Sequence, residues 1–599
     1  MGAGHLMMPP RDEYTQRLTR WSADIERENK RYTQVSDLRL VVSIAAAILA
    51  YLAFGPVVIS SLWLLAPAVI FFVLMLIHSK IDKRRQFARR AARYYEQGLK
   101  RLDDEWAGTG NAGDKFADPE HPYASDLDLF GRGSLFELLS TARTYEGEAT
   151  LANWLKHPAA QEEATQRQQA VRELAPNVDQ REKLMLLGEE VRSGVQAQAL
   201  AEWAAHPPVA YFKGARLAAF GLAVATLAAF GGYWVGWWTS SVFLIAFLIG
   251  QLFAGAFFRQ TRVILGQLQA RAHDLTLLSD LLKEFEQAKF TAPKLTAIQA
   301  TVQLDGKAAS ARIRQLETLL ALHENGSNQY LIPIAIVLLW HTQVAMAVEA
   351  WRCENGPHIA QWLTALGEFE ALSSFACYAY ERPALIDPEL MTVIGVIATG
   401  LGHPLLPEKS CVTNDVTLGG LIRLLVVSGS NMSGKSTLLR AIGLNIVLAW
   451  AGAPVRASSL KVGPVTLGAS LRTVDSLQEG RSRFYAEITR LRQIADLAKG
   501  QKPLLFLLDE LLSGTNSHDR RIGAQSIVEG LLRRGAIGLI TTHDLALAEI
   551  GKQLGDSARN VHFEDQLENG VMRFDYKMRP GVVERSNALE LMRAVGLMD

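Results

Sequence analysis

The residues best suited to chemistry form a glycine-rich loop that directly follows the mostly apolar run Leu421–Val427. The loop has the spacing G-x-x-x-x-G-K-[ST], and Leu438–Leu448 after it has the composition of a helix. In such a loop backbone N–H groups wrap a triphosphate, the lysine reaches its β- and γ-phosphates, and the next serine reaches Mg²⁺. We therefore predict an ATP site with Ser436 as a magnesium ligand, formed by Gly429, Ser430, Asn431, Met432, Ser433, Gly434, Lys435, Ser436 and Thr437.

Two acidic residues follow the next strongly apolar run, Pro503–Leu508. This order suits Asp509 to hold the Mg²⁺ shell and Glu510 to polarise an attacking water, which distinguishes hydrolysis from binding alone. A third predicted strand, Gly538–Thr542, carries His543 at its end, where it could sense the γ-phosphate or orient the water. The structural alternatives are a solvated acid at position 510 and an ordinary strand-end histidine at position 543.

A glycine and a serine, Gly480 and Ser482, open an amphipathic helix far along the chain from the phosphate loop. A helix N-terminus with free N–H groups and a hydroxyl favours anions. We expect this pair to complete the nucleotide site of a second copy, so that each ATP lies between two chains. Asn516, Ser517 and Asp519, just beyond the catalytic acids, would lie along the same dimer seam. The alternative for Ser482 is a plain helix N-cap.

These motifs together resemble the MutS family, whose ATPase domain is of the ABC type. The phosphate loop is similar to the family's G-P-N-M-G-G-K-S-T, with Ser430 and Ser433 as departures, and Gly480–Phe484 is similar to its G-R-S-T-F. Asp509–Asp519 resembles the family's D-E-I-G-R-G-T-S-T-Y-D. Gly402-His403-Pro404 and Asn414-Asp415 look like its R-H-P and P-N-D elements, and this resemblance places Val412, Thr413 and Asn414 near the adenine.

The resemblance continues upstream in stretches that look like the start and the end of the MutS helical core, 128–171 and 359–383. It does not extend to the family's mismatch-recognition and connector domains, for which we find no room before Asp128. No phenylalanine-x-glutamate element that probes a mispaired base is found either. We therefore expect the first part of the chain to have another role.

Two long runs lack any charged residue, Leu40–Ile77, broken near Gly55-Pro56, and Leu217–Phe258, broken at Gly231–Trp238. Each has the length of two short membrane helices joined by a turn, and the second carries an aromatic cluster typical of a membrane interface. We therefore predict two transmembrane hairpins. The alternative is a set of buried core helices in a soluble protein, which charge-free runs of this length do not favour.

Basic residues flank the first hairpin on both sides, most densely in Lys80–Arg93, and more weakly the second. The positive-inside rule then places both ends of each hairpin, and the ATPase, in the cytoplasm. A further apolar stretch, Leu331–Val348, contains His341 and Gln343, and we interpret it as a buried helix of the core. The predicted location is the cytoplasmic (inner) membrane, with several passes.

The composition agrees with a chain that has both membrane and soluble parts, because 49 % of the 599 residues are hydrophobic and only 21 % are charged. Cys353, Cys377 and Cys411 have no metal-ligand spacing and fit free thiols in a reducing compartment. The net charge of +1 gives no electrostatic argument for nucleic acid.

The predicted fold is an α/β ABC-type P-loop ATPase domain at the C-terminus, preceded by an all-α MutS-core or lever region that carries two transmembrane hairpins. The predicted boundaries are 1–37 for a charged N-terminal helix, 38–78 for hairpin 1, 79–125 for a basic helix and linker, 126–212 for the first part of the core, 213–259 for hairpin 2, 260–384 for the second part, and 385–599 for the ATPase domain.

The predicted function is a membrane-anchored, homodimeric ATPase that uses ATP and Mg²⁺ to move a helical core, with DNA left open as a ligand. One alternative is a tethered DNA-binding protein of mismatch repair or recombination, acting on mismatched or branched DNA. Another is the ATPase subunit of a transport system, for which four membrane helices would be few.

Overall fold

The computed structural model describes residues 8–55, 59–194, 197–209, 211–212, 214–304, 306–430, 432–471, 483–512, 515–543, 545–568 and 571–583. The chain divides into two compact units. Met1–Leu139 and Cys377–Asp599 form the first, which contains an α/β domain and a long helical hairpin. Ser140–Ala376 forms the second, which is almost wholly helical.

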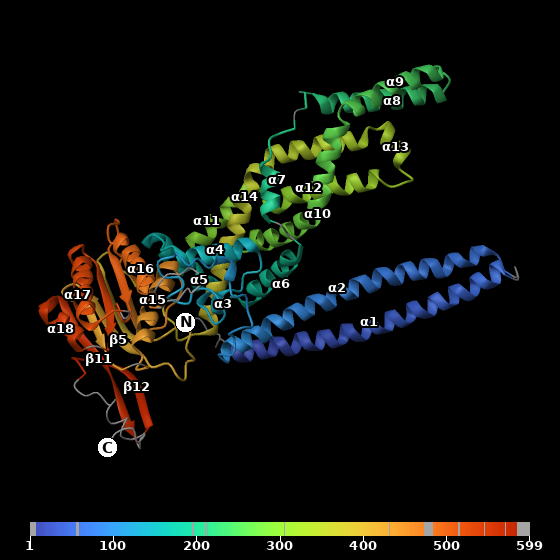
Figure 1. Ribbon diagram of the computed structural model, residues 1–599. Helices are drawn as coiled ribbons and strands as arrows, with labels where there is room; N and C mark the ends of the chain where they lie inside the picture. Colours follow the sequence, from blue (N-terminus) through green and yellow to red (C-terminus); the bar gives the residue numbers. More distant parts are fainter. Residues whose placement is uncertain are drawn as a thin grey trace, which may run out of the picture. The chain divides into compact units, whose positions relative to one another are not determined.

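A mostly parallel sheet lies at the centre of the α/β domain (Figure 1). Among the described residues its strand order is β12-β11-β6-β10-β9-β8, and β12 pairs antiparallel with β11. Three inner strands are buried along their whole length, as expected for apolar parallel strands that are covered on both faces. The strands are β6 (Leu424–Ser428), β8 (Thr466–Ser470), β9 (Leu504–Leu508), β10 (Ile537–Thr542), β11 (Ala558–Glu568) and β12 (Val571–Pro580).

Helices cover both faces of this sheet. On one face the apolar core joins the strands to α16 (Arg483–Leu497), α17 (Ser517–Arg533) and α18 (Leu545–Gln553). On the other lies α15 (Lys435–Ala451), where a Cβ on Gly443 would come within 3.0 Å of a Leu507 methyl group. A smaller sheet has the order β3-β7-β4-β5, from Glu389–Leu390, Ser459–Val462, Gly395–Leu401 and Asn414–Gly419.

A segment from before the helical unit packs on the α/β domain through Asp126. This carboxylate accepts hydrogen bonds from Leu471 N at 2.7 Å and from Arg490 Nη2 at 2.7 Å. The same segment contains η2 (Asp114–Phe116) and α3 (Leu135–Leu139). Its polar contacts therefore fix the strand end at β8 and the helix α16 that follows the predicted trans motif.

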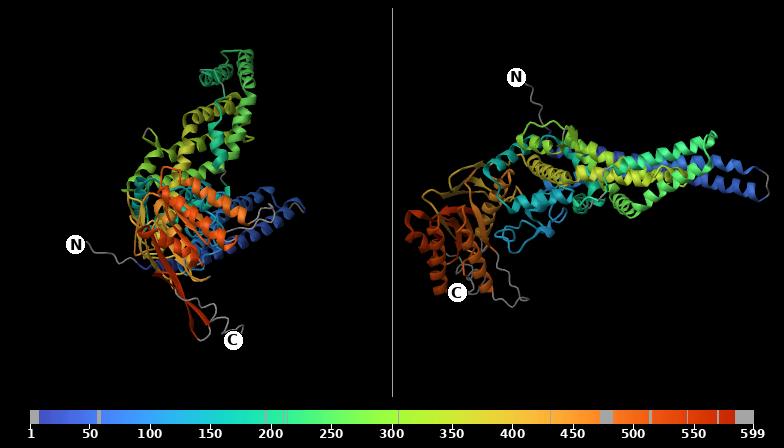
Figure 2. Two further views of the ribbon diagram at one scale, coloured as in Figure 1. Left: turned by 60° about the vertical axis from the view of Figure 1, so that its left-hand side comes forward. Right: turned by 90° about the horizontal axis from the view of Figure 1, so that it is seen from above.

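A long antiparallel hairpin is formed by α1 (Pro10–Phe54) and α2 (Leu65–Leu102), with the short η1 (Ser61–Leu64) near its tip; the two helices lie side by side in Figures 1 and 2. Each helix runs without interruption from its charged part into its apolar part. At the base, Tyr14 packs edge-on against Tyr95 with ring centroids 5.3 Å apart, and Arg101 pairs with Glu381 at 2.6 Å.

The helical unit consists of a packed base and an apolar hairpin. In the base Phe285 of α10 lies 4.4 Å, centroid to centroid, from Phe369 of α14, and both are buried. Its helices are α4 (Tyr145–Lys156), α5 (Gln161–Leu174), α6 (Val178–Gly194), α7 (Ala197–Ala205), α10 (Phe258–Gln287), α11 (Pro293–Thr301), α12 (Ala309–Gly326), α13 (Ile332–Val337) and α14 (Trp340–Glu381), with a short ladder of β1 (Gln303–Leu304) and β2 (Lys307–Ala308).

The apolar hairpin is α8 (Ala215–Trp234) and α9 (Ser240–Ala256). Small buried residues of α8, such as Ala219 and Ala223, allow close approach of the helices. Within the part of the chain that the structure describes, three helices are long and apolar enough to cross a membrane by length and composition: α1, η1 with α2, and α8. A fourth is added if α9 and the start of α10, bent by 59°, count as one span.

The prediction of one buried helix over 331–348 is wrong. The chain forms two helices here, because Leu339 takes a left-handed backbone conformation (φ 50°) between α13 and α14. The second part, with Val344 and Val348, is buried, whereas Ile334 and Ile336 of the first part are exposed. The local break turns the apolar residues of α13 away from the core that the continuous pattern suggested.

Candidate active site

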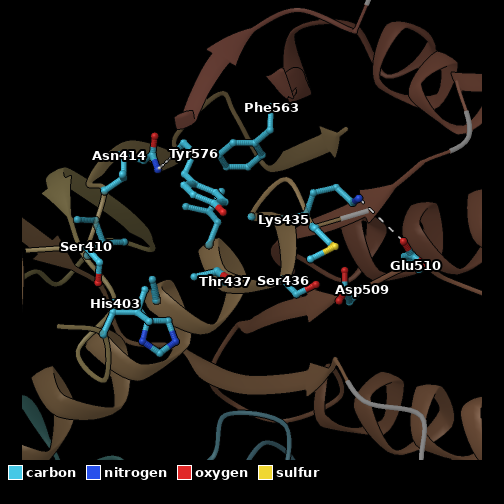
Figure 3. A pocket seen from close by; sticks show the side chains of 17 residues that line it. His403, Ser410, Asn414, Lys435, Ser436, Thr437, Asp509, Glu510, Phe563 and Tyr576 are labelled. Carbon is cyan, nitrogen blue, oxygen red and sulfur yellow. Dashed lines mark hydrogen bonds and ion pairs between the residues drawn. The ribbon is translucent and has the colours of Figure 1, made fainter. Parts of the chain in front are cut away.

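Three neighbouring strands bring the predicted catalytic residues together. The phosphate loop follows β6, Asp509 and Glu510 follow β9, and His543 follows β10, and these strands are parallel neighbours. Their carboxyl ends therefore meet at one edge of the sheet. A cavity of about 740 Å³ opens there, and Figure 3 shows the side chains that line it.

The phosphate loop has the backbone that close approach to an anion requires. Gly434, the N-cap of α15, has a φ of 106°, in the region that favours glycine. The Lys435 ammonium is buried and donates hydrogen bonds to the carbonyl oxygens of Gly429 at 2.9 Å and Ser430 at 2.7 Å. Burial lowers the pKa of Lys435 below its ordinary value, although Glu510 and Asp509 act in the opposite direction. Asn431 lies outside the described residues.

Ser436 and Asp509 both line the cavity, and Figure 3 shows them on the same side of it. Thr541 holds this region in place, because its hydroxyl donates to Asp509 Oδ1 and accepts from the Glu510 N–H at 3.0 Å. A serine hydroxyl beside a carboxylate offers the hard oxygen ligands that Mg²⁺ prefers.

Glu510 lies at the centre of a small charged group. Its Oε1 is 3.4 Å from His543 Nδ1 and 4.0 Å from Lys435 Nζ. Its backbone is left-handed (φ 47°), which costs free energy for a residue with a side chain and is typical of functional positions. The carboxylate is thus held between a histidine and the phosphate-loop lysine.

The loop also fits a phosphate group by a test that does not depend on the motif. The hydroxyl oxygens of Ser430 and Ser433 are buried, and neither has a hydrogen-bond partner within the described residues. These are the two positions where the sequence departs from the family's loop. Buried polar groups are rarely left unpaired, so two orphaned hydroxyls in this loop indicate a polar ligand.

The far wall of the cavity contains two of the three residues that were predicted to lie near the adenine. Val412 and Asn414 line the cavity, while Thr413 does not and instead accepts a hydrogen bond at its carbonyl from Lys577 Nζ at 2.8 Å. Asn414 is fixed by its Nδ2, which donates to the Tyr576 carbonyl at 3.0 Å, and by its Oδ1, which accepts from Met578 N at 2.8 Å.

Sequence reasoning missed the aromatic residues of this wall, Tyr576 and Phe563, which the hairpin β11–β12 supplies. His403 also lines the cavity. Its pKa is lowered to about 4, mainly by burial and further by Arg440 and Arg456, so it is neutral and its Nδ1 accepts from Leu405 N at 3.2 Å. No local pattern in the sequence pointed to Tyr576 or Phe563, because strand pairing brings both to the cavity.

The predicted trans motif and dimer seam are only partly described. Gly480 and Ser482 lie outside the described residues, as does the side chain of Ser517. Asn516 is the N-cap of α17, where its Oδ1 accepts from Asp519 N at 2.9 Å and its Nδ2 donates to the Asp519 carboxylate at 2.7 Å. These two residues therefore have a local capping role, and the seam stays a prediction.

Comparison with known proteins shows which family the α/β domain resembles. The family MutS domain V matches residues 425–599. The chain is 30 % identical over 296 residues to the endonuclease MutS2 of Thermus thermophilus, covering 47 % of this chain and 38 % of the relative. It is 31 % identical over 267 residues to the DNA mismatch repair protein MSH6 of Arabidopsis thaliana, covering 41 % and 20 %.

A third relative is the DNA mismatch repair protein MutS of Natronomonas pharaonis, 34 % identical over 252 residues, with 40 % of this chain and 28 % of the relative covered. The chain thus spans 20 % to 38 % of the length of these three relatives.

Proposed function

The chain belongs to the MutS family, and from this premise we propose that it is a membrane-anchored ATPase that couples ATP binding and hydrolysis to movement of its helical core. One observation carries the ATPase part of this proposal: residues of the phosphate loop, Asp509 and Glu510 line a single cavity, and Glu510 Oε1 lies 3.4 Å from His543 Nδ1. A carboxylate next to a histidine can activate a water molecule, which hydrolysis requires in addition to nucleotide binding.

Each residue has a task that follows from its contacts. Lys435 and the N–H groups at the start of α15 hold the β- and γ-phosphates, Asn414 and Tyr576 flank the base, and Ser436 with Asp509 would hold Mg²⁺. Bound Mg²⁺ would supply positive charge against the phosphate oxygens. Glu510 orients the attacking water and accepts its proton, and His543 steadies the carboxylate.

We further propose that two chains face each other, so that Gly480 and Ser482 of one close the site of the other. The cavity on a single chain is partly open, which supports this arrangement because it leaves room for residues of a second chain. Binding free energy of ATP at two such sites would favour the closed pair, and hydrolysis would release it.

Membrane anchoring is supported by the exposed surfaces of the two apolar hairpins. The most apolar windows of α1 and α2 are only 6 % and 11 % buried within the chain, whereas an ordinary soluble core helix would hide them. Exposed apolar side chains such as Ile44, Ile48, Val69 and Phe72 would otherwise form a large patch in water. The proposed location is the cytoplasmic membrane, with the ATPase on the cytoplasmic side.

A second candidate is that the ATPase acts on DNA, which the names of the relatives favour: an endonuclease and two DNA mismatch repair proteins. The test is ATP turnover of the detergent-solubilised full-length protein with no DNA, duplex, mismatched and branched DNA. Stimulation by one DNA form that persists at physiological salt would support the DNA role. Turnover that ignores every DNA would exclude it, and absence of any turnover would overturn the ATPase proposal itself.

A further inference from the structure

A second cavity, of about 580 Å³, lies in the helical unit between α9, α10, α12, α13 and α14. Its size is that of an ordinary small-molecule site. It contains none of the residues of the nucleotide site, and the proposed ATPase gives it no role.

One side of the cavity is apolar, with Phe258, Leu265, Ile332 and Ile336 among its lining residues. The wall also contains Gly255, where an added Cβ would meet no atom within 4 Å. The space beside α9 is therefore open, and a larger side chain at this position would enter it without a clash.

The other side is basic and polar. Arg262, His323 and His341 line it, and the two imidazole rings pack edge-on with centroids 5.2 Å apart. The Nδ1 atoms of both histidines are buried, and neither has a hydrogen-bond partner among the described residues. Burial is the main cause that lowers the pKa of both histidines, so near neutral pH they are uncharged and each offers one N–H donor.

The described residues that line the cavity include no Asp or Glu. The positive charge of Arg262 is therefore not balanced within the lining, and two imidazoles lie nearby with unused hydrogen-bonding atoms. This combination of one cation and two neutral donors suits an anionic group.

The cavity adjoins the apolar hairpin. Gln251, on the otherwise apolar α9, donates from Nε2 to the Ile336 carbonyl at 3.1 Å, which attaches α13 to the hairpin. A Cβ on Gly250 would lie 3.6 Å from a Leu339 methyl group, so the junction of α13 and α14 packs on the same helix. Because α13 contacts both α8 and α9, its exposed residues Ile332 and Ile334 extend the exposed apolar surface of these helices.

We propose that this cavity binds one anionic membrane phospholipid, with an acyl chain along the apolar side and the phosphate against Arg262 and the two histidines. The inference rests on the membrane anchoring proposed above, and it names a ligand for a second site. An acyl chain matches the apolar wall and its continuity with the hairpin, whereas a soluble anion would leave that wall without a partner.

The test measures phospholipid retained by the full-length protein after purification in detergent and exchange into a second detergent. Gly255→Leu fills the cavity and Arg262→Gln removes its cation. The matched controls are Gly221→Leu on α8, where an added Cβ also meets nothing within 4 Å, and Arg259→Gln, which does not line the cavity. We expect the wild type and both controls to retain phosphatidylglycerol. Arg262→Gln should lose about tenfold in affinity, as removal of a charged hydrogen bond does. Gly255→Leu should lose a similar amount because its side chain occupies the space of the acyl chain.

Rebinding to lipid-stripped protein separates the possible ligands. Preference for phosphatidylglycerol over phosphatidylcholine, with no competition from glycerol phosphate, supports the proposal. Equal retention in all five proteins, indifference to head-group charge, or displacement by glycerol phosphate alone would overturn it. A carbonate wash of membranes tests the anchoring proposal separately. If anchoring is wrong, the wash releases the protein from the membranes, whatever lipid it binds.

Discussion

Glu510 occupies the point where two strand ends and the phosphate loop meet, 3.4 Å from His543 and 4.0 Å from Lys435. Its replacement by Gln keeps the shape and removes the base. We expect turnover to fall by about 10² to 10⁴ while ATP binding persists, so that the closed dimer accumulates. Phosphate release and size-exclusion chromatography with ATP measure the two effects. Glu549→Gln on the surface of α18 is the control, and a Glu510→Gln protein that hydrolyses ATP at the control's rate would contradict the assignment.

Tyr576 places an aromatic ring on the cavity wall where we propose that the base of ATP binds, and its backbone carbonyl accepts a hydrogen bond from Asn414. Tyr576→Ala removes the ring and keeps the carbonyl. Base–aromatic stacking contributes about 1–3 kcal/mol, so ATP affinity should fall by roughly tenfold or more, whereas Tyr576→Phe should bind like the wild type. Equilibrium binding of a fluorescent ATP analogue compares the affinities of the two variants. Equal affinities would show that the Tyr576 ring does not contact the bound nucleotide.

The two sides of the cavity differed in how far the sequence could predict them. The phosphate loop and Asp509–Glu510 are short local patterns, and parallel strands must bring their carboxyl ends together. Tyr576 and Phe563 reach the cavity only because β11 pairs with β6 and carries β12 with it. Pairing between strands so far apart in the sequence depends on tertiary packing, and the spacing of residues within a short motif does not predict it.

At the scale of the element, α13 shows a limit of apolar patterns. The run from 331 to 348 looks like one buried helix, but the left-handed Leu339 divides it and leaves Ile334 and Ile336 exposed. Hydrophobicity alone does not distinguish a buried face from a face directed at lipid. The continuity of α1 and α2 through their charged and apolar parts was likewise not evident from composition.

The helix α14 carries a buried acid, Glu370, which accepts hydrogen bonds from the Thr144 hydroxyl and from Thr144 N at 3.2 Å. Burial, the largest cause, raises its pKa from 4.5 to about 7. The folded state therefore holds this proton more tightly than the unfolded chain. Its contribution to stability is complete below the unfolded pKa and is lost as pH rises through the folded pKa.

We expect the free energy of unfolding of the full chain to decrease between pH 5 and pH 8, by at most roughly 3 kcal/mol from this group. Glu370→Gln should abolish that part of the pH dependence, because the amide does not titrate. Glu368→Gln, two residues away and paired with Lys294, is the control and should keep the wild-type slope. Denaturant unfolding in detergent at the two pH values is the measurement, and identical slopes for Glu370→Gln and the wild type would contradict it.

At the scale of the whole molecule, both apolar hairpins should have their tips on the outer side of the membrane. Single cysteines introduced at Ser60, between α1 and α2, and at Thr239, between α8 and α9, should react with a membrane-impermeant maleimide in intact cells. The exposed native Cys353 should react only after the cells are permeabilised. Labelling of Cys353 before permeabilisation, or protection of both tips, would contradict the proposed topology.

The central claim is that two membrane-anchored chains share their ATP sites, and mixing two inactive variants tests it most directly. Lys435→Ala disables the phosphate loop of one chain, and Ser482→Arg disables the trans motif of the other. In a mixed dimer one site keeps an intact loop and an intact trans motif. We predict that each variant alone is inactive and that co-reconstituted variants regain part of the wild-type ATP turnover. A mixture as inactive as its components, in lipid where both are shown to associate, would contradict the shared site.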